Sequence, residues 1–523
     1  MNYVGTARPI HDAKGKATGY SKYAGDISLS NMAYLCMLHS KIPHGYVKAV
    51  HAEKALALPG VYGVYHCLNT SERKYNRYRS SFDQAYLANE ERAFNQYVRF
   101  VGDKIGAVAA CDQETAERAA RLVEVEYEEL PFSIGFDDTL AGKNCLEGET
   151  PVRDEYTLEV GKKQESTEGL IEVCSTMELP RLHHATMETH ACIADYDPYS
   201  DMLTVYCPNQ AVHGIRTVLA DFLEMPESHV RVVKATMGGS FGAKQEWFLE
   251  PVTALVAKKL CRPVKLVYSR GEAMTDTIVR GAMRMSARGY YTPDGEMKEI
   301  YCDVTLDAGA YIGNAGDYVR ALAGKPTRCY CIPYMHYHGQ VISSNSPVSG
   351  AFRSWSAAEE ALMMERQLDA AAEKLGMDRL AIRLKNVARS GEEDKKLHLS
   401  LEDIRIGDAI TLGSEKFGWD KLKAEDAAFN VSQQRYRRGV GIGIGGHGNT
   451  YFPRFNDYGE GSISLNADGS MQANFTLHDH GCGTVTAMRM IAAEVLKVPE
   501  DKIYMTEGDT AVTPIDYGCF ASR

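Results

Sequence analysis

One pattern of hydrophobic and polar positions occurs twice along the chain, with its parts in the same order. Each copy has two strands joined by a turn, a polar loop, a helix followed by a proline, and a third strand that opens into a glycine-containing loop. A proline just past a helix, followed by a strand, is the usual transition between these two elements. The shared order predicts one structural unit present twice. The first copy comprises strands 191–196 and 203–206, a helix ending at 223 and strand 230–234; the second comprises strands 461–465 and 472–477, a helix ending at 496 and strand 502–506.

The loops of both copies are rich in glycine and expose backbone N–H groups. In the first copy they are 207–210 and 237–242, and in the second 478–483 and 508–510. Two such sets facing one another would form a large polar cleft, which suits a bulky anionic cofactor. The alternative is that the glycines of 237–242 only permit tight backbone packing.

The remaining sequence divides the chain into three parts. The first mixes strands with a helix predicted over 114–123, followed by strand 123–127, and a polar connector covers 151–169. A helical stretch, 356–388, is followed by the charged segment 389–396, which is typical of a boundary. We therefore predict an α+β protein with domains 1–135, 136–390 and 391–523.

Composition limits the classes of function. The chain has 523 residues, 44% of them hydrophobic and 24% charged, and a net charge of -11. That length predicts two to four domains, and the acidic balance without a basic stripe argues against a nucleic-acid partner. No apolar leader and no run of 18 apolar residues occurs, so we expect a cytoplasmic protein that does not enter a membrane.

The 13 cysteines form no C-x2-C pair and no cluster of four. We expect reduced and mostly buried thiols. If the protein carries out redox chemistry, its iron–sulfur clusters must lie on a partner chain.

The glycine-rich loop of the first copy reads Gly238-Gly239-Ser240-Phe241-Gly242-Ala243-Lys244. It lacks the Gly-Lys-Ser/Thr end of a Walker loop, which disfavours nucleotide binding. The loop resembles the Gly-Gly-x-Phe-Gly-x-Lys element of the xanthine dehydrogenase and aldehyde oxidase family. Other elements of that family follow in the expected order: His184 to His190, Pro208-Asn209-Gln210, Asp307-Ala308-Gly309, Ala351-Phe352-Arg353, and Gly508-Asp509-Thr510 with Thr513-Pro514.

Residues 4–26 also resemble the start of the family's α/β-hammerhead domain. The resemblance implies a hammerhead domain at 1–135, followed by two molybdopterin-binding α/β domains that contain the repeated unit.

The same resemblance implies a molybdenum–pyranopterin cofactor, either Mo-molybdopterin or its cytosine dinucleotide. The pterin holds the metal in this family, so no direct side-chain ligand is expected. Gln210, Phe241, Arg353 and Ala521 would contact groups bound to molybdenum. Without the resemblance, Gln210 is better explained as an amide that closes a loop. The expected cofactor-binding residues are Gln210, Gly239, Phe241, Gly242, Arg353, His480, Gly481, Cys482, Ala521 and Ser522; Cys482 stands where relatives often carry Gln.

The family hydroxylates an electron-poor carbon with oxygen from water. The resemblance gives catalytic roles to Gln210, Gln245, Arg320, Arg353 and Trp355. Arg320 falls where purine-oxidising relatives carry an arginine that faces the substrate, and Gln245 where animal xanthine oxidases have a glutamate. Arg320 is otherwise a surface arginine paired with Asp317.

Aromatic side chains would bind a flat substrate ring between their faces. Trp355 matches an aromatic that packs against the substrate in the family, and Tyr451 is a second candidate. Core packing explains either aromatic equally well.

These residues favour a purine such as xanthine or hypoxanthine, with an aldehyde or a nicotinate-type heterocycle as the alternative. Electrons would pass to [2Fe-2S] and FAD partner subunits.

The family's general base is a glutamate in a Gly-Glu-Pro-like element, which does not occur in this sequence. The chain stops at Arg523, inside the loop that would hold the cofactor. We therefore expect an incomplete unit that is inactive alone. The alternatives are a second polypeptide that completes the loop and a fragment without catalytic activity.

Overall fold

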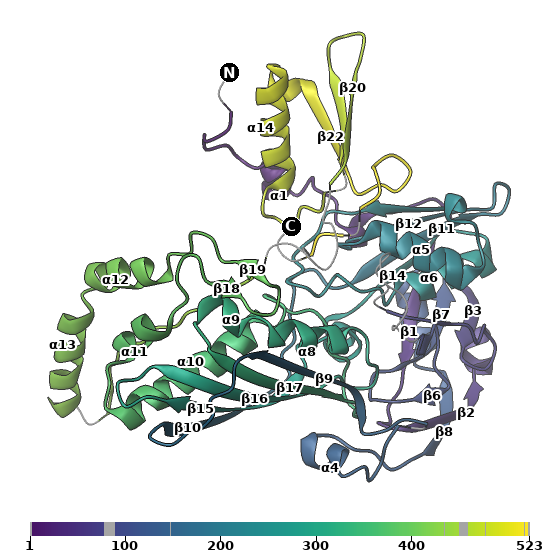
Figure 1. Cartoon of the computed structure of the whole chain (residues 1–523). Helices are drawn as coiled ribbons and strands as arrows, with labels where there is room; N and C mark the ends of the chain where they lie inside the picture. The colour runs from purple at the N-terminus through teal and green to yellow at the C-terminus, as the bar shows by residue number, and fades with distance from the viewer. Residues whose placement is uncertain are drawn as a thin grey trace.

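The computed structural model describes residues 3–77, 89–146, 148–432, 435–448, 459–475, 477–516 and 518–520. A seven-stranded sheet joins the N-terminal part of the chain to the first copy of the repeat (Figure 1). Its strand order is β13-β12-β11-β14-β1-β7-β3, and β1 pairs in parallel with β14 through Ala33 and Val264. The strands are β1 Ala33–His39, β3 Val61–His66, β7 Lys104–Ala110, β11 Ala191–Asp197, β12 Met202–Cys207, β13 Val230–Lys234 and β14 Val264–Val267.

Two helices cover the first-copy end of this sheet, namely α5 (Val212–Leu223) and α6 (Glu250–Leu260). Both are largely buried because they share one hydrophobic core with the strands of the N-terminal part. The N-terminal domain and the first copy are therefore packed as one body.

The rest of the N-terminal part contains a small sheet, β6-β2-β8, and the helix α3 (Gln113–Ala120). Asp112 caps α3 by accepting a hydrogen bond from the Thr115 backbone N–H at 2.7 Å, so the helix predicted at 114–123 is confirmed with shorter bounds. The remaining elements here are α1 Ala13–Thr18, α2 Glu53–Leu56, α4 Phe136–Leu140, β2 Gly45–His51, β4 Lys74–Tyr75, β5 Glu91–Arg92, β6 Tyr97–Val98 and β8 Glu124–Glu129.

A second body is built on a five-stranded sheet of order β10-β15-β16-β17-β9. The helices α8 (Ala315–Ala323) and α10 (Ala357–Leu375) pack on it around a second core. Residues between 136 and 390 thus divide between this body and the seven-stranded sheet. The strands are β9 Val152–Gly161, β10 Ile171–Leu179, β15 Ala282–Tyr291, β16 Met297–Asp307 and β17 Tyr334–Ile342.

The helical stretch predicted over 356–388 is two helices, α10 and α11 (Arg379–Asn386). Gly376 ends α10 with φ at +64°, and Asp378 caps α11 through the backbone N–H of Leu380 at 2.8 Å. The break lets α11 fold back onto α10. Beyond it lie α12 Ile406–Phe417, α13 Trp419–Ser432, β18 Glu393–Asp394 and β19 Leu399–Ser400, with the shorter α7 Arg270–Asp276 and α9 Pro326–Cys329 earlier in the chain.

The repeated unit predicted from the sequence is confirmed. In the second copy, β20 (Gly461–Leu465) pairs antiparallel with β21 (Met471–Phe475), which pairs in parallel with β22 (Ile503–Glu507), as β11, β12 and β13 do in the first copy. The helix α14 (Thr484–Leu496) lies where α5 lies. Each helix ends at a residue with positive φ, Glu224 or Lys497, two positions before its proline.

The second copy is joined to the first along the edge of β13. Lys234 donates its backbone N–H to the Gly508 carbonyl at 2.7 Å, and Thr510 donates to the Val232 carbonyl at 3.1 Å. Arg231 forms two hydrogen bonds with the Asp509 carboxylate, at 3.0 and 2.6 Å. Figure 1 shows the second copy, in yellow, projecting from the other two bodies.

Candidate functional site

The glycine-rich loop after β13 is in contact with the loop 351–353 of the second body. Gly242 has φ at +103°, and a Cβ there would lie 2.5 Å from the Ala351 carbonyl oxygen, so only glycine fits. Arg353 donates its backbone N–H to the Phe241 carbonyl at 2.8 Å, and its guanidinium lies 4.3 Å from the centre of the Phe241 ring. The two loops that carry predicted cofactor contacts therefore meet.

Two buried histidines of the segment 184–190 form hydrogen bonds with the backbone of these two loops. His184 Nε2 lies 2.8 Å from the Ala351 carbonyl, and His190 Nε2 lies 3.0 Å from the Ala243 carbonyl. Burial lowers the pKa of His184 to about 4 and that of His190 to about 3. Both rings are thus neutral at pH 7, and each forms a hydrogen bond that holds a loop carbonyl in place.

Gln210 lies where three segments meet. Its backbone N–H donates to the Lys244 carbonyl at 2.9 Å, and its side-chain amide donates to the Cys519 carbonyl at 2.6 Å. The Ser240 hydroxyl donates to the amide oxygen. Gln210 is only 3% exposed, so it closes the loops, as its residue type suggests, while lying among the predicted cofactor contacts. One of its two amide N–H groups is taken by Cys519.

Three histidines gather where the two copies meet: His213 on α5 and His478 are buried, and His480, also before α14, is half-buried. The backbone of Pro514 is a hydrogen-bond partner of His213, and that of Asn209 is a partner of His478. Among the described residues, the buried Nε2 of His480 has no hydrogen-bond partner. Burial lowers the pKa of His213 and of His480 to about 4, and the cation of Lys234 adds to the shift at His480. Lys234 is itself buried and lies 3.0 Å from Glu507.

Unpartnered buried nitrogens cost about 1–3 kcal/mol each. A polar ligand between the two copies would supply hydrogen-bond partners for the imidazoles of this cluster. The pterin and phosphate of a molybdenum–pyranopterin offer many donors and acceptors together with negative charge, which the neutral imidazoles and Lys234 complement. The residues present therefore fit this group.

The segment His480-Gly481-Cys482 lies at the start of α14. Asp479 accepts backbone hydrogen bonds from Gly481 at 2.7 Å and from Gly483 at 3.3 Å, which fixes the loop. Cys482 is exposed, with its Sγ 2.9 Å from the Thr484 hydroxyl. Ala521, Ser522 and Tyr451 lie outside the described residues.

The residues expected to face a substrate differ in their contacts. Gln245 is buried, and its amide oxygen has no hydrogen-bond partner among the residues that the structure describes. Trp355 is stacked on Tyr318, with ring centres 5.7 Å apart and an interplanar angle of 26°. Arg320 forms a hydrogen bond of 2.8 Å with Asp154 on β9 and lies 5.7 Å from the Tyr156 ring. Its guanidinium is therefore engaged by a carboxylate of a neighbouring strand.

The backbone around Trp355 is strained. Ser354, Trp355 and Ser356 have φ at 61°, 32° and 62°, a left-handed region that side chains with a Cβ rarely adopt. Lys325 holds this turn by donating from Nζ to the Trp355 carbonyl and to the Ser356 hydroxyl, the latter at 2.8 Å. The strain fixes the tryptophan ring beside Tyr318.

Sequence reasoning missed several buried polar groups. His213 and Lys234 carry no signal beyond their residue type, since their burial depends on contact between the copies. Glu246 follows Gln245 and is fully buried, and burial raises its pKa to about 8. Within the described ranges of the chain, the Oε2 atom of Glu246 has no hydrogen-bond partner.

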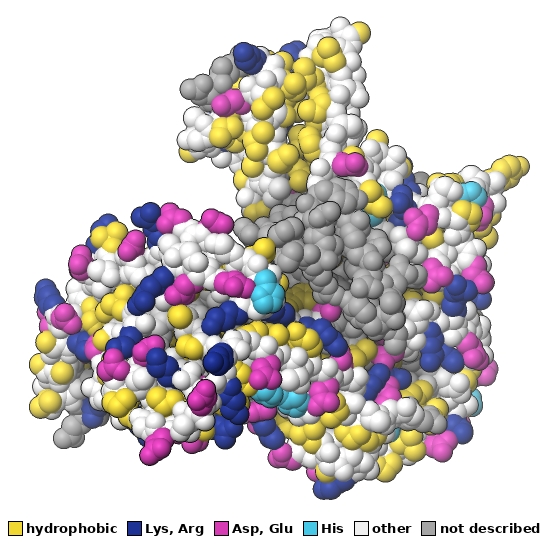
Figure 2. All heavy atoms as spheres, viewed as in Figure 1, with side chains coloured by type: hydrophobic (Ala, Val, Ile, Leu, Met, Phe, Trp, Pro, Cys, Tyr) yellow, Lys and Arg dark blue, Asp and Glu magenta, His cyan; other side chains and the backbone are white. Residues whose placement is uncertain are grey.

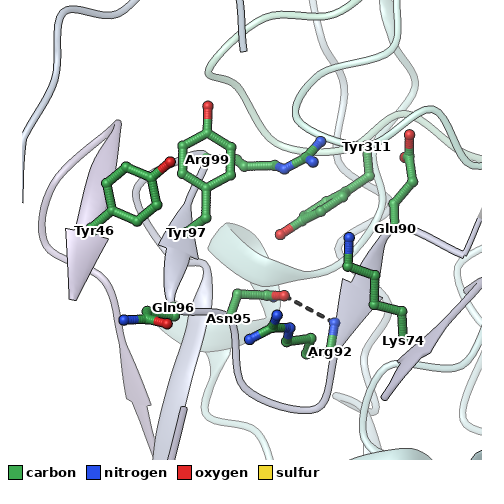
Figure 3. Close-up of a pocket in the computed structure, with 9 residues that line it drawn as sticks. All are labelled: Tyr46, Lys74, Glu90, Arg92, Asn95, Gln96, Tyr97, Arg99 and Tyr311. Atoms are coloured by element: carbon green, nitrogen blue, oxygen red, sulfur yellow. Dashed lines mark hydrogen bonds between the residues drawn. The ribbon is translucent and has the colours of Figure 1, made fainter. Parts of the chain in front are cut away.

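Two cavities lie elsewhere. One of about 150 Å³ lies between the hammerhead strands and Tyr311 (Figure 3). Its polar walls are already paired, Arg99 with Glu149 at 2.8 Å and Glu90 with the Ile312 backbone N–H at 2.9 Å. The other, of about 350 Å³, is lined by Arg328, Asp394 and His447 among others. Neither lining contains a predicted site residue.

Comparison with known families covers most of the chain. The aldehyde oxidase and xanthine dehydrogenase a/b hammerhead domain matches residues 18–131, and molybdopterin cofactor-binding domains match 149–387 and 412–523. The xanthine dehydrogenase molybdenum-binding subunit of Escherichia coli O157:H7 is 30% identical over 535 residues, a match covering 98% of this chain and 68% of that subunit. The chain belongs to the xanthine dehydrogenase and aldehyde oxidase family.

Two further comparisons give a second sequence relative and a solved structure of similar fold. The nicotinate dehydrogenase large molybdopterin subunit of Eubacterium barkeri is 30% identical over 384 residues, a match that covers 73% of this chain and 88% of that subunit. The crystal structure of quinoline 2-oxidoreductase from Pseudomonas putida 86 superposes with a TM-score of 0.90 at 22% identity, covering all of this chain and 68% of that one. The predicted α+β fold, a hammerhead domain followed by molybdopterin-binding domains, is confirmed.

Among the described residues, no helix is long and apolar enough to cross a membrane.

Proposed function

We propose that the chain holds a molybdenum–pyranopterin between its two repeated units, as the cofactor-binding part of a purine hydroxylase. The observation that carries the proposal is the cluster of His213, His478 and His480 with the buried Lys234 at the junction of the copies. His213 follows the Gln210 loop of the first copy, and His478 and His480 lie in the loop before α14 of the second copy. The side chain of Gln210 is in turn bonded to Cys519 and to Ser240 of the Gly238–Gly242 element.

The cofactor would be either Mo-molybdopterin or its cytosine dinucleotide. Gly239, Phe241, Gly242 and Arg353 would hold it from the side of the first copy, and His480, Gly481 and Cys482 from the second; Ala521 and Ser522 are further contacts that we propose from the sequence. When bound, the group supplies the two-electron redox chemistry by which oxygen from water enters an electron-poor carbon.

The chain's own residues would orient the cofactor and the substrate. The amide N–H of Gln210 that Cys519 does not take is a donor for an anionic oxygen, fixed in place by the bonds to Ser240 and Lys244. The free amide oxygen of Gln245 can accept a hydrogen bond from a ring N–H of the substrate. The faces of Tyr318 and Trp355 give the site an aromatic wall.

A flat nitrogen heterocycle suits this wall and these amides, and xanthine or hypoxanthine is the purine proposed. The similarity to the xanthine dehydrogenase subunit supports that choice. The pairing of Arg320 with Asp154 leaves the alternative open, an aldehyde or a nicotinate-type heterocycle, because a purine-facing role would require Arg320 to turn from this partner.

The names of the relatives as subunits support a heteromeric enzyme. We propose an iron–sulfur subunit and an FAD subunit as partners that carry the electrons away, with a further polypeptide completing the molybdenum-binding part.

The test uses the chain isolated with its partners. Molybdenum content and the fluorescence of the oxidised pterin are measured, followed by steady-state rates on xanthine, hypoxanthine, nicotinate and benzaldehyde. The proposal expects stoichiometric pterin and the highest kcat/KM on a purine. Pterin with preference for nicotinate or benzaldehyde would replace the substrate, and a complex without pterin would favour a non-catalytic fragment.

Variants of Gln210 sharpen the test. Gln210→Glu keeps the shape of the side chain but removes its donor, and we expect kcat to fall by about a hundredfold, as for loss of a donor that stabilises developing charge. Asn466→Asp, an exposed amide in the turn before β21, is the matched control and should leave kcat unchanged.

A further inference from the structure

A buried lysine holds the turn that carries Trp355. Lys325 lies between α8 and α9 and is 7% exposed. Its Nζ donates to the Trp355 carbonyl and, at 2.8 Å, to the Ser356 hydroxyl. A lysine is rarely buried unless its ammonium is paired, and a charged donor forms a stronger hydrogen bond than a neutral one. These two acceptors pair the buried ammonium with the turn.

The turn depends on this contact because its backbone is strained. Ser354, Trp355 and Ser356 all have positive φ. Residues with a Cβ keep this conformation only where the surrounding structure holds them in it. By bonding the carbonyl of Trp355 and the hydroxyl of Ser356, Lys325 fixes the peptide plane that joins the two residues. The position of the tryptophan side chain follows from the position of this plane.

The ring that Lys325 places lies against a residue that is itself fixed. Trp355 is half-buried and stacked on Tyr318, with ring centres 5.7 Å apart. Tyr318 is buried on α8, and its hydroxyl has the Ser356 backbone and the Glu359 side chain as hydrogen-bond partners. A change in the turn would therefore move the tryptophan ring relative to a fixed Tyr318.

A second cation holds the other half of the same loop. Arg280 donates from Nη2 to the Phe352 carbonyl at 3.3 Å and to the Arg353 carbonyl at 3.2 Å. Its Nε lies 2.8 Å from the Glu359 carboxylate. A guanidinium stays charged at any pH that the protein meets, whereas a buried lysine readily loses its proton. Of the two cations, Lys325 is the one whose hold on the loop depends on pH.

The charge of Lys325 is influenced by groups on several elements. Glu360 and Glu359 of α10 favour the ammonium, whereas Arg328 of α9 and Lys396, between β18 and β19, disfavour it. Figure 2 shows Lys and Arg side chains gathered on the surface over α8 and α9. Burial has the largest influence, and it lowers the pKa of Lys325 to about 8. The ammonium is therefore charged at pH 7 and loses its charge slightly above.

Two neighbours of Lys325 are titratable as well. Burial raises the pKa of Glu360 to about 8. Burial lowers the pKa of His447, and the cations of Lys325 and Arg328 lower it further, so this ring is neutral at pH 7 and above. Glu360 is thus the group that an experiment has to separate from Lys325.

We propose that Lys325 is a positioning residue of the substrate site, whose ammonium fixes the Trp355 ring at the place where it meets a flat substrate. The inference rests on the proposed function, in which Trp355 forms one wall of that site. Loss of the charge weakens both hydrogen bonds to the turn, so the strained backbone relaxes and the ring shifts. A flat heterocycle is then bound less tightly, because its contact with the aromatic face is lost.

The first experiment observes the ring in the lone chain, without cofactor or partners. The chain has three tryptophans, and incorporated fluorotryptophan gives each a fluorine NMR resonance, with W355F assigning that of Trp355. We expect this resonance to move as pH is raised from about 7 to about 9, with a midpoint near 8. In K325M it should be displaced at every pH. Its shift between light and heavy water, which reports exposure of the ring, should increase.

Further variants identify the group that titrates. K325R keeps its charge throughout this range, so its Trp355 resonance should not titrate. E360Q should still titrate, with a lower midpoint, because the acid no longer favours the ammonium. The matched control is K265M: Lys265 is also buried and donates to the Gly25 carbonyl at 2.6 Å, within the seven-stranded sheet.

The results that contradict the proposal are distinct for each variant. The K265M resonance should titrate as in the unmodified chain. A Trp355 ring equally exposed in K325M and in the unmodified chain would overturn the proposal, as would a titration that persists in K325R. If K325M or K325R does not fold, the midpoint in E360Q decides, since a midpoint that disappears would assign the titration to Glu360.

The second experiment measures substrate binding in the complex with its partners. K325M should raise KM for xanthine by about tenfold and change kcat by less than about twofold, because a displaced wall weakens binding and leaves the chemical step intact. K325R and K265M should keep the unmodified KM. KM of the unmodified complex should rise above about pH 8, and that of K325R should not. A lower kcat with unchanged KM in K325M would contradict the positioning role.

The two experiments separate this inference from the proposed function. A Trp355 resonance that follows Lys325, in a complex without hydroxylase activity, would refute the proposed function and leave the hold on the ring intact. An active complex in which neither KM nor the Trp355 resonance responds to Lys325 would refute the positioning role alone.

Discussion

The two copies of the repeat share their order of elements but not their surroundings. In α5 the apolar positions are buried on all sides, because α6 and β4 pack against it and Phe222 touches the ring of Tyr75, with ring centres 5.6 Å apart. In α14 only four residues are buried, namely Val485, Thr486, Ala492 and Ala493. The same local pattern therefore produces a core helix in one place and a half-covered helix in another.

This difference teaches that burial in each copy is decided by its neighbours. The first copy belongs to a sheet that also contains β1, β7 and β3, whereas the sheet of the second copy has three strands in the part of the chain that the structure describes. Substitutions at equivalent positions should therefore lower the free energy of unfolding by very different amounts. They test whether α14 and β20 are exposed to solvent in solution.

The largest contrast is expected between Phe222→Ala and its counterpart Val495→Ala. Truncating the buried Phe222 leaves a cavity and should lower the free energy of unfolding by about 3–5 kcal/mol. Val495→Ala should change it by less than about 0.5 kcal/mol in the lone chain, since Val495 is exposed. Urea unfolding followed by tryptophan fluorescence measures both, and equal losses would mean that α14 is covered in solution.

The second-largest contrast is expected between glycine substitutions in the loops of the two copies. Gly242→Ala places a Cβ on a residue with positive φ and against the Ala351 carbonyl. We therefore expect the free energy of unfolding to fall by about 2–4 kcal/mol and no pterin to be retained. Gly481→Ala has positive φ but no atom within 4 Å of the new Cβ, and should cost only about 1–2 kcal/mol. Unfolding midpoints and pterin fluorescence distinguish them; a Gly242→Ala protein that binds pterin normally would show that the loops separate.

The junction of the copies should be sensitive to acid. The pKa of His213 and of His480 is lowered to about 4, from an ordinary value near 6.5, because burial disfavours the charged ring. Between pH 6.5 and 4 the unfolded state holds more protons than the folded state, so stability is full above pH 6.5 and falls as pH is lowered, by up to about 3 kcal/mol for each histidine.

Thermal unfolding at pH 7, 5.5 and 4.5 measures this acid response. His480→Gln should reduce it. His51→Gln is the control, because the pKa of His51 is raised, chiefly by its hydrogen bond to Glu126, so this histidine does not share the lowered pKa of the junction. Identical acid responses in all three proteins would place the histidines outside the junction.

The smallest effect is expected at the edge that joins the copies. Asp509→Asn weakens the two hydrogen bonds from Arg231, whose side chain is 43% exposed and partly screened by solvent. We expect hydrogen exchange of β22 to quicken by about two- to fivefold, while β12 is unchanged. Equal acceleration in both strands would mean that the copies open as one unit.

The elements of the repeat were predictable because their signals are local. The alternation in 461–465, the proline after each helix and the glycines after each third strand lie within a few residues of one another. The resemblance in turn located Gln210, Phe241 and Arg353, which the structure brings close together.

What the sequence could not predict depends on distant contacts. The pairing of β1 with β14 joins Ala33 to Val264, and nothing near either strand indicates it. Arg320 on α8 forms a hydrogen bond with Asp154 on β9, 166 residues earlier in the chain, a pairing that nothing near Arg320 in the sequence indicates. The cluster of His213 with His478 exists only because two copies meet, which no local pattern records.

The parallel pairing of β1 with β14 also determines when β1 can complete its strand pairing during synthesis. Val264 leaves the ribosome about 230 residues after Ala33, which at about 5–20 residues per second takes on the order of ten to fifty seconds. During that time the edge of β1 has no β14 to pair with, and an apolar strand edge is a site of aggregation. A nascent chain of this protein should therefore depend on holding chaperones until the first copy is complete.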